Sequence, residues 1–320
     1  MAAAQPQRRA TPDPGDDLVR VSAPALIALR HAAESLPLRS PRQLGSMAGP
    51  HLSAFKGRGM EFEETRPYQP GDDVRSLHWR VTARTGRPHT KLFREERERS
   101  VLLWVDQRGP MWFATRGAFK AVQAARAAAL LAWSAAGHGD RVGGLIFADQ
   151  GHRELRPRLG HKGVLHLIHR LAEPVEPPRG YDPEHSARSL ATALGRLRRV
   201  AHPGSLIFLV SDFRGLSGPA RAHLAQLARH NDLVMLFLYD RLEQQLPAAG
   251  QFRLSDGRAS VQLNAADPRA RQRHRSHFDQ QLRQLQELAR RHRIHLLPCA
   301  SDSELEPHLR QGLGLGRKRA

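Results

Sequence analysis

The stretch SLIFLVSDF, residues 205–213, decides the fold class of this 320-residue chain. Its apolar residues form a continuous run instead of alternating with polar ones. A strand of this kind is buried on both faces, as in a parallel sheet covered by helices. The stretches VLLWVD at 101–106 and DLVMLFLYD at 232–240 have the same character. We therefore expect three central, fully buried strands, at residues 101–105, 205–210 and 233–238.

Helical patterns separate these strands along the chain. We expect helices at residues 117–137, 162–172, 186–200, 218–230 and 268–292. Further strands are expected at 141–149 and 294–299, and a small hairpin at 251–264 with Asp256-Gly257 in its turn. Buried strands that alternate with helices predict an α/β fold with a doubly wound, mostly parallel sheet over residues 98–315.

The N-terminal third of the chain has a different composition. Residues 1–20 are rich in Pro, Ala and Arg without periodicity, which predicts a disordered tail. Residues 21–97 are expected to hold a helix over 22–37, capped by Ser22, and then an irregular β-rich segment that packs against the sheet. Residues 316–320 form a basic tail.

The chain is strongly basic, with 50 Lys and Arg against 31 Asp and Glu and a formal net charge of +19. Such an excess is typical of proteins that bind nucleic acid or acidic membranes. A GC-rich genome, which favours Arg codons, explains the same excess without a function. The Arg residues are scattered along the chain, and aromatic residues make up only 6%. We therefore expect no single basic groove.

Several other classes of protein are excluded or disfavoured. No apolar run approaches the about 18 residues of a membrane helix, and the first residues lack the apolar core of a secretory signal. The single cysteine, Cys299, excludes an internal disulfide and is expected to be a small buried hydrophobe. We expect a soluble cytoplasmic protein.

Three of the expected strands end in an acidic residue: Asp106, Asp149 and Asp212. In doubly wound sheets, ligands bind at the carboxyl ends of the strands. The sequence after the first strand, DQRGPMWF, has neither the GxGxxG nor the GxxxxGK pattern, so a nucleotide cofactor is not expected. No other cofactor is indicated.

A dense motif lies between residues 57 and 100. Its members are Gly57, Gly59, Glu61, Phe62, Arg66, Tyr68, Pro70, Gly71, Asp72, Asp73, Arg75, Trp79, Ala83, Arg84, Glu95 and Glu96. In this order they resemble the signature of a bacterial family called domain of unknown function 58. The sequences GDRVG at 139–143 and VSDF at 210–213 are also similar to that family, and the resemblance covers residues 22–315.

The resemblance implies a von Willebrand factor A-like α/β domain, here in a short form without the two N-terminal membrane helices of other members. Genes of the family often neighbour a MoxR-type AAA+ ATPase. The implied role is a non-enzymatic adaptor that binds protein partners during the maturation of other protein complexes. The sequence leaves two alternatives open, a basic nucleic-acid-associated protein and a metal-dependent hydrolase.

The charged residues of the motif have three possible roles. We expect an ion-pair and turn network, with Trp79 as its buried anchor. A partner-docking surface is the first alternative. Catalysis by the carboxylate pairs Glu63/Glu64 or Asp72/Asp73 is the second, although no Lys or His completes such a site.

A-type domains often hold Mg²⁺ or Mn²⁺ through a D-x-S-x-S pattern after the first strand. Here the corresponding residues are Asp106-Gln107-Arg108-Gly109-Pro110, and neither Arg108 nor Pro110 can bind a metal. We expect Arg108 to contact Asp106 or Asp212 and take the place of the cation. The site is thus predicted to be degenerate and metal-free.

Three large apolar residues follow in the same loop, Met111, Trp112 and Phe113. They belong either to the core or to an apolar docking patch for a partner.

Overall fold

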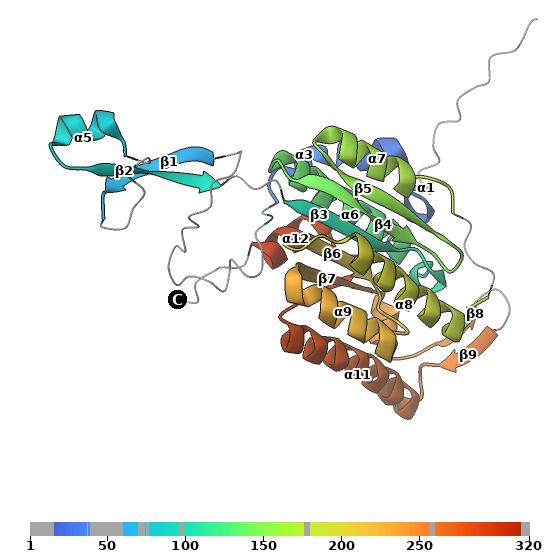
Figure 1. Ribbon diagram of the computed structural model, residues 1–320. Coiled ribbons are helices and arrows are strands. Elements are labelled where there is room, and N and C mark those ends of the chain that lie inside the picture. The colour runs from blue at the N-terminus through green and yellow to red at the C-terminus, as the bar shows by residue number, and fades with distance from the viewer. Residues whose placement is uncertain are drawn as a thin grey trace, which may run out of the picture. The chain divides into compact units, whose positions relative to one another are not determined.

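The structure is a computed structural model (Figure 1). It describes residues 16–36, 38, 60–69, 74, 77–95, 99–175, 180–255 and 260–314. These residues fall into two compact units, because residues 48–98 separate from the rest of the chain. Each unit is described by itself.

The larger unit is built on a six-stranded sheet with the order β10-β7-β6-β3-β4-β5. Its strands are β3 (Ser100–Asp106), β4 (Arg141–Phe147), β5 (His152–Leu159), β6 (Leu206–Ser211), β7 (Asp232–Tyr239) and β10 (His295–Ala300). All neighbouring strands run parallel except β4 and β5. The mostly parallel sheet predicted from the sequence is therefore confirmed.

The three strands predicted to be central lie inside the sheet, and their apolar side chains are buried. Alternate residues of β3 enter two separate buried clusters, with Leu103 and Val105 in one cluster and Leu102 and Trp104 in the other. Both faces of the strand are thus covered, which is why its sequence is continuously apolar.

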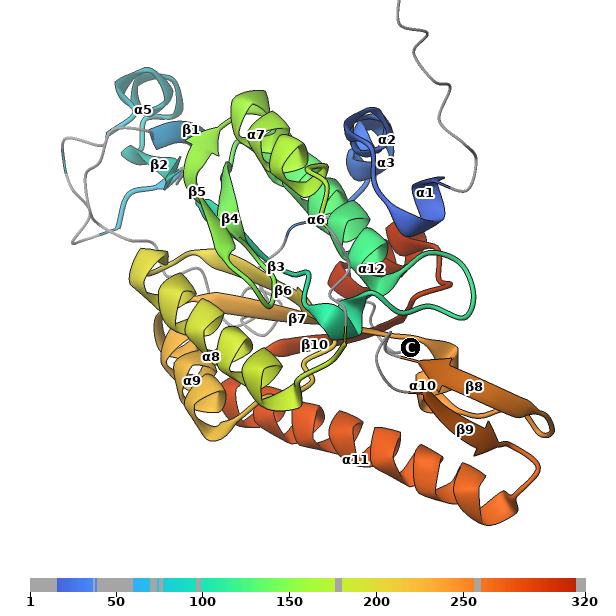
Figure 2. The same cartoon turned by 90° about the vertical axis from the view of Figure 1, so that its right-hand side faces the viewer.

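Helices cover the two faces of this sheet, as Figures 1 and 2 show. One face packs against α2 (Ala23–Ala28), α3 (Arg30–Ala33), α6 (Lys120–Gly137), α7 (His161–Leu171) and α12 (Leu305–Leu313). The other face packs against α8 (Pro183–Val200), α9 (Gly218–His230) and α11 (Pro268–His292). The shorter elements are α1 (Asp16–Val19), η2 (Gly109–Met111), α10 (Arg241–Gln244) and the antiparallel pair β8 (Gln251–Ser255) and β9 (Ser260–Asn264).

The N-terminal segment differs from expectation in two places. Residues 16–19, expected within the disordered tail, form α1. The single helix expected over 22–37 is divided into α2 and α3 at Leu29, where the backbone stays close to helical at φ −67° and ψ −7°. Leu26 and Leu36 are buried as the helical pattern required. The turn of the 251–264 hairpin, Asp256-Gly257, lies outside the described residues.

The strand order creates a topological switch point between β3 and β6. From β3 the chain continues through α6 to β4, whereas from β6 it continues through α9 to β7 on the opposite side. The carboxyl ends of β3 and β6 therefore flank the crevice in which this class of fold binds ligands.

The smaller unit consists of an antiparallel pair, β1 (Met60–Pro67) and β2 (His89–Glu95), with α5 (Trp79–Thr85) between them in sequence. Gly86, at φ +68°, ends α5 in the left-handed conformation. Within this unit the expected burial of Trp79 is wrong, because Trp79 is 68% exposed at the first position of α5.

Much of the motif lies outside the described residues, namely Gly57, Gly59, Pro70, Gly71, Asp72, Asp73, Arg75 and Glu96. Of the described members, Arg66 donates a hydrogen bond to the carbonyl of Pro67, the Tyr68 amide donates to the carbonyl of Pro88, and Arg84 is exposed in α5. The ion-pair network expected there and its packing against the sheet stay predictions.

In the described part of the chain, no helix is both long and apolar enough to cross a membrane.

Candidate functional site

Three carboxylates lie buried along the carboxyl edge of the sheet. Asp106 is the last residue of β3, Asp212 follows β6 directly, and Asp240 follows β7 directly. Each is at most 1% exposed. A buried carboxylate is stable only when other groups of the protein replace its hydration, so the partners of these residues define the site.

Arg108 is the partner of Asp106. Its guanidinium is fully buried and donates from Nη2 to Oδ2 of Asp106 at 2.7 Å and from Nε to Oδ1 at 3.0 Å. The backbone N–H of Arg108 also donates to Oδ1, at 2.9 Å, and the Ser211 hydroxyl donates to Oδ2, at 2.6 Å. The predicted contact between Arg108 and a carboxylate is therefore confirmed.

The same guanidinium connects three elements of the fold. Nη1 donates to the carbonyl of Ser186 in α8 at 2.9 Å and to the carbonyl of Arg214, after β6, at 3.2 Å. Nη2 lies 3.7 Å from Oδ1 of Asp212. Burial alone would lower the pKa of Arg108, but Asp106 and then Asp212 raise it above its ordinary value. Arg108 therefore stays charged and holds the ends of β3 and β6 together.

Lys120 provides a second buried cation, which sequence reasoning missed. It begins α6, is completely buried, and places Nζ 3.2 Å from Oδ2 of Asp212 and 2.7 Å from Oε1 of Glu243 in α10. Burial alone would raise the pKa of Asp212, but Lys120, Arg108 and Arg214 hold it below its ordinary value. The sequence contained one feature that could have identified Lys120. Lys is rare in this chain, with only five residues, and this one lies in an Ala-rich helix.

The buried acidic and basic side chains at this edge form a connected series in which charges of opposite sign alternate. Glu243 also pairs with Nη2 of Arg214 at 3.0 Å. The members in order are Asp106, Arg108, Asp212, Lys120, Glu243 and Arg214. We call these six residues the edge network. Its three carboxylates and its three cations balance in formal charge.

Asp240 is stabilised by neutral donors instead. It accepts hydrogen bonds from the Thr115 hydroxyl at 2.6 Å, the Thr115 amide at 2.7 Å and the Ser301 hydroxyl at 3.1 Å. Burial opposes the ionised form, but these hydrogen bonds hold the pKa of Asp240 below its ordinary value. Sequence reasoning missed Asp240, although it ends DLVMLFLYD as Asp106 ends VLLWVD.

Asp149 was predicted to end a strand, but β4 ends at Phe147, and Asp149 instead supports the loop after β3. Its Oδ2 accepts a hydrogen bond from the Gly109 amide at 2.7 Å. Its carbonyl accepts hydrogen bonds from His185 and Ser189 of α8. These contacts indicate that Asp149 holds the loop after β3 and α8 in place.

The residues at this edge do not fit the divalent cation that A-type domains hold. Both carboxylate oxygens of Asp106 are occupied by Arg108, whose guanidinium lies within 4 Å of Asp106 and Asp212 alike. Pro110 lies in η2 and provides no oxygen ligand from its side chain. Among the described residues, no group of three or more His, Cys, Asp and Glu is arranged to hold a metal. That this site binds no metal stays a prediction, which titration with Mg²⁺ and Mn²⁺ tests.

The three apolar residues of the loop after β3 have different environments. Met111 is fully buried in the core, so for this residue the core alternative is confirmed and the docking-patch alternative is wrong. Trp112 and Phe113 are half-buried. The indole of Trp112 donates from Nε1 to the carbonyl of Gln107 at 3.0 Å.

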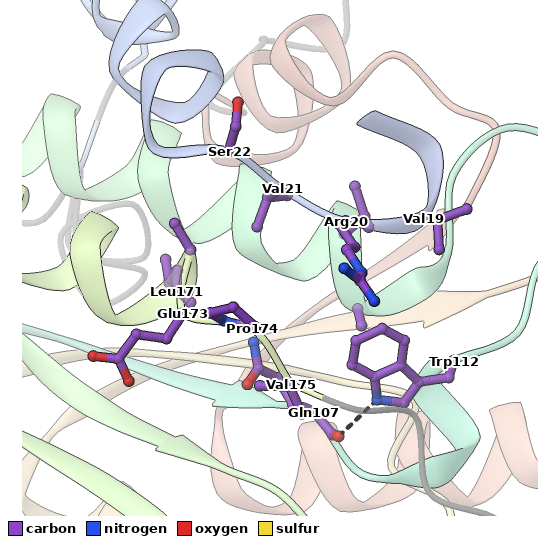
Figure 3. A pocket seen from close by; sticks show the side chains of 13 residues that line it. Val19, Arg20, Val21, Ser22, Gln107, Trp112, Leu171, Glu173, Pro174 and Val175 are labelled. Atoms are coloured by element: carbon purple, nitrogen blue, oxygen red, sulfur yellow. Dashed lines mark hydrogen bonds between the residues drawn. The ribbon is translucent and has the colours of Figure 1, made fainter. Parts of the chain in front are cut away.

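Trp112 also lines a cavity of about 310 Å³ (Figure 3). The indole lies on one side of this cavity and Leu171, Glu173 and Pro174 lie on the other. The remaining lining residues are Val19, Arg20, Val21, Ser22, Gln107, Ala121, Val122, Ala172 and Val175. Of the three residues predicted as a patch, only Trp112 reaches this cavity. We call it the Trp112 cavity.

Cys299 lies buried in β10, as expected. Burial raises the pKa of its thiol to about 12, so it is protonated at neutral pH and is a poor nucleophile. The carboxylates of the edge network are also poor catalytic groups. They are paired with cations, which makes them unsuited to acid–base catalysis. What the arrangement does is to fix the loops after β3 and β6 and the beginning of α8 against one another.

Comparison with known proteins places the chain in a family. A model of the family described as "Protein of unknown function DUF58" matches residues 64–288, from β1 into α11. Uncharacterized proteins of Mycobacterium tuberculosis and Mycobacterium bovis are each 33% identical to the chain over 234 residues, which is 73% of this chain and 72% of each relative. The chain belongs to the DUF58 family.

Proposed function

We propose that this protein is a non-enzymatic protein-binding module. In this proposal it acts in the cytoplasm as an adaptor for a MoxR-type AAA+ ATPase during the maturation of other protein complexes. The observation that carries the proposal is the edge network. At the edge where doubly wound sheets place their ligand site, Asp106 and Asp212 are neutralised by Arg108 and Lys120. They are therefore not available for acid–base or metal chemistry.

A von Willebrand factor A-like fold is part of the proposal. Two features support it: an Asp at the end of the first strand of the sheet, Asp106, and an Asp after the fourth strand, Asp212. Both lie at the carboxyl edge, where A-type domains keep their metal ligands. A guanidinium and an ammonium group here provide the positive charge that the metal provides there.

Partner binding is expected on the loops that the edge network holds in place. Loops fixed on a rigid scaffold are the usual location of binding residues, and Trp is frequent among residues that dominate binding energy. Trp112 meets both conditions, because it lies in the loop after β3, directly after η2, and lines the Trp112 cavity.

The direct test is calorimetric titration of the purified chain with the MoxR-type ATPase of the same organism. We expect binding that weakens far less with salt than binding to phosphates does, and that Trp112→Ala weakens by about tenfold or more. Leu165→Ala, which removes an exposed apolar side chain from α7 outside the Trp112 cavity, is the matched control and should leave the affinity unchanged. Absence of measurable binding to the ATPase would contradict the proposal.

The net charge of +19 favours the second candidate, a nucleic-acid-associated protein. Binding driven by phosphate contacts weakens steeply with salt. Tight binding of duplex or single-stranded oligonucleotides at physiological salt would replace the first proposal with this one.

A further inference from the structure

A second cavity, of about 600 Å³, lies between the loop after β6 and α11. Its lining is rich in hydrogen-bond donors, including Arg214, Arg221, His277, Gln280, Gln281 and Gln284. No Asp or Glu is found among the described residues that line it. We call it the arginine cavity, and its chemistry suits a negatively charged group.

Arg221 is oriented in this cavity by neutral acceptors. Its Nε donates to the carbonyl of Leu216 at 3.1 Å and its Nη2 donates to Oε1 of Gln284 at 3.2 Å. In the described contacts its positive charge is not matched by a carboxylate, in contrast to Arg214, which pairs with Glu243. A guanidinium has five N–H donors in a fixed plane, so Arg221 keeps donors for an incoming carboxylate.

The loop that walls the cavity has an unusual backbone. Phe213 and Gly215 are both left-handed, with φ of 52° and 73°. This conformation is costly for a bulky residue and is retained where surrounding contacts impose it. In this loop the Asp212 side chain is buried in the edge network, while the neighbouring Arg214 side chain is 42% exposed.

Hydrogen bonds with Ser211 and with the edge network hold this loop. The Phe213 amide donates to the Ser211 hydroxyl at 2.9 Å, and the Arg214 amide donates to Oδ1 of Asp212 at 3.0 Å. Nη1 of Arg108 donates a hydrogen bond to the carbonyl of Arg214 at 3.2 Å. The buried charges thus shape one wall of the arginine cavity before any ligand arrives, which lowers the cost of ordering on binding.

We propose that the arginine cavity binds an acidic segment of a partner protein, with Arg221 pairing one of its carboxylates and Arg214 lying beside it. The inference rests on the proposed protein-binding function. A peptide fits better than a nucleic acid, since a phosphate backbone is bound by a row of cations along a groove. This cavity offers two guanidinium groups, and one of them already serves Glu243.

The test is fluorescence anisotropy with two labelled peptides, hexaglutamate and hexaglutamine, at about 0.15 M salt. We expect the full chain to bind hexaglutamate and not hexaglutamine. Arg221→Gln should weaken hexaglutamate binding by about tenfold or more, because a hydrogen-bonded charge pair is lost. Arg283→Gln removes the same charge from an exposed position of α11 outside the cavity lining, and should change the affinity less than twofold.

Equal losses in Arg221→Gln and Arg283→Gln would overturn the inference, because the peptide would then respond to net charge alone. Absence of hexaglutamate binding, or displacement of the peptide by inorganic phosphate or an oligonucleotide at lower concentration, would also overturn it. The ATPase titration is a separate measurement. A chain that binds the ATPase but not hexaglutamate retains the proposed function and loses this inference. A chain that binds hexaglutamate through Arg221 but not the ATPase retains the inference.

Discussion

The edge network and the surface of α8 contain ion pairs of the same chemistry in opposite environments. At the edge, Arg108 and Asp106 are 2.7 Å apart with both side chains fully buried. On α8, Arg188 and Glu184 are 3.6 Å apart with side chains 67% and 86% exposed. The two environments meet within one turn of helix, because the buried Ser186, which contacts Arg108, lies between Glu184 and Arg188 in sequence. Because both pairs join an Arg to a carboxylate, they separate the effect of burial from that of the kind of residue.

We expect burial to matter because of the solvation of the charges when the pair is broken. An exposed arginine that loses its partner is hydrated, so the pair contributes little. A buried carboxylate that loses its partner stays in a low-dielectric environment without compensation, and the cost is several kcal/mol. The predictions below test this contrast from its largest expected effect to its smallest.

Arg108→Ser should have the largest effect. It leaves Asp106 buried without its main partner, so we expect a loss of about 3–5 kcal/mol in the free energy of unfolding. Denaturant unfolding followed by circular dichroism measures this loss. A loss below about 1 kcal/mol, the value of an exposed pair, would show that the edge is hydrated and that the contrast is wrong.

Lys120→Met should be the next most damaging. It removes the ammonium group between Asp212 and Glu243 but keeps a long apolar side chain in α6, and we expect a loss of about 3 kcal/mol. Since Arg108 and Arg214 still lie near Asp212, the loss should be no larger than that of Arg108→Ser. The same unfolding measurement on Lys162→Met, in the first turn of α7 and exposed, is the control.

Acid should weaken the edge through Asp212. Its pKa in the folded protein lies below the unfolded value of about 3.9, so its stabilisation is complete above that pH and is lost as the pH falls toward the folded pKa. The free energy of unfolding should therefore decrease as the pH is lowered from about 5 to 3. Asp212→Asn should flatten this decrease, whereas the exposed Glu184→Gln should keep the wild-type slope. Identical slopes in all three proteins would contradict the assignment.

Arg188→Ala should have a small effect, about 0.5 kcal/mol or less, because both members of its pair are exposed. Unfolding in denaturant at low and high salt provides the measurement, and any contribution should decrease as salt screens the pair. A loss comparable with that of Arg108→Ser would remove the contrast between the two environments.

Mg²⁺ and Mn²⁺ should have no effect on the wild-type protein, because Arg108 occupies the oxygens of Asp106. Calorimetric titration is the test. Stoichiometric binding at micromolar affinity that Asp106→Ala abolishes would show that the edge holds a metal after all.

The sequence predicted most of the fold, because the signals for it are local. The continuous apolar runs of β3, β6 and β7 each reveal a strand covered on both faces. The regular alternation of those strands with helices then restricts the topology. The error at Trp79 has the opposite origin, since a large aromatic residue inside a motif carries no signal of its own exposure.

The candidate site was predicted only in part. Asp106, Arg108 and Asp212 follow strands directly, and the carboxyl ends of parallel strands meet at one edge, so their proximity could be inferred. Lys120 and Glu243 are in contact although 123 positions apart in the chain. No spacing rule connects two such positions, so their pairing was not predicted.

The sequence by itself therefore determined the α/β class and the central strands, and it showed that Arg108 and Pro110 have no side-chain oxygen that could bind a metal. These depend on periodicity and on the chemistry of single side chains. Only the tertiary structure decided that Lys120 is the second buried cation, that Met111 belongs to the core while Trp112 lines a cavity, and that Arg221 lies among neutral acceptors. The reason is that burial and partner choice arise from packing between distant segments, and one segment does not contain that information.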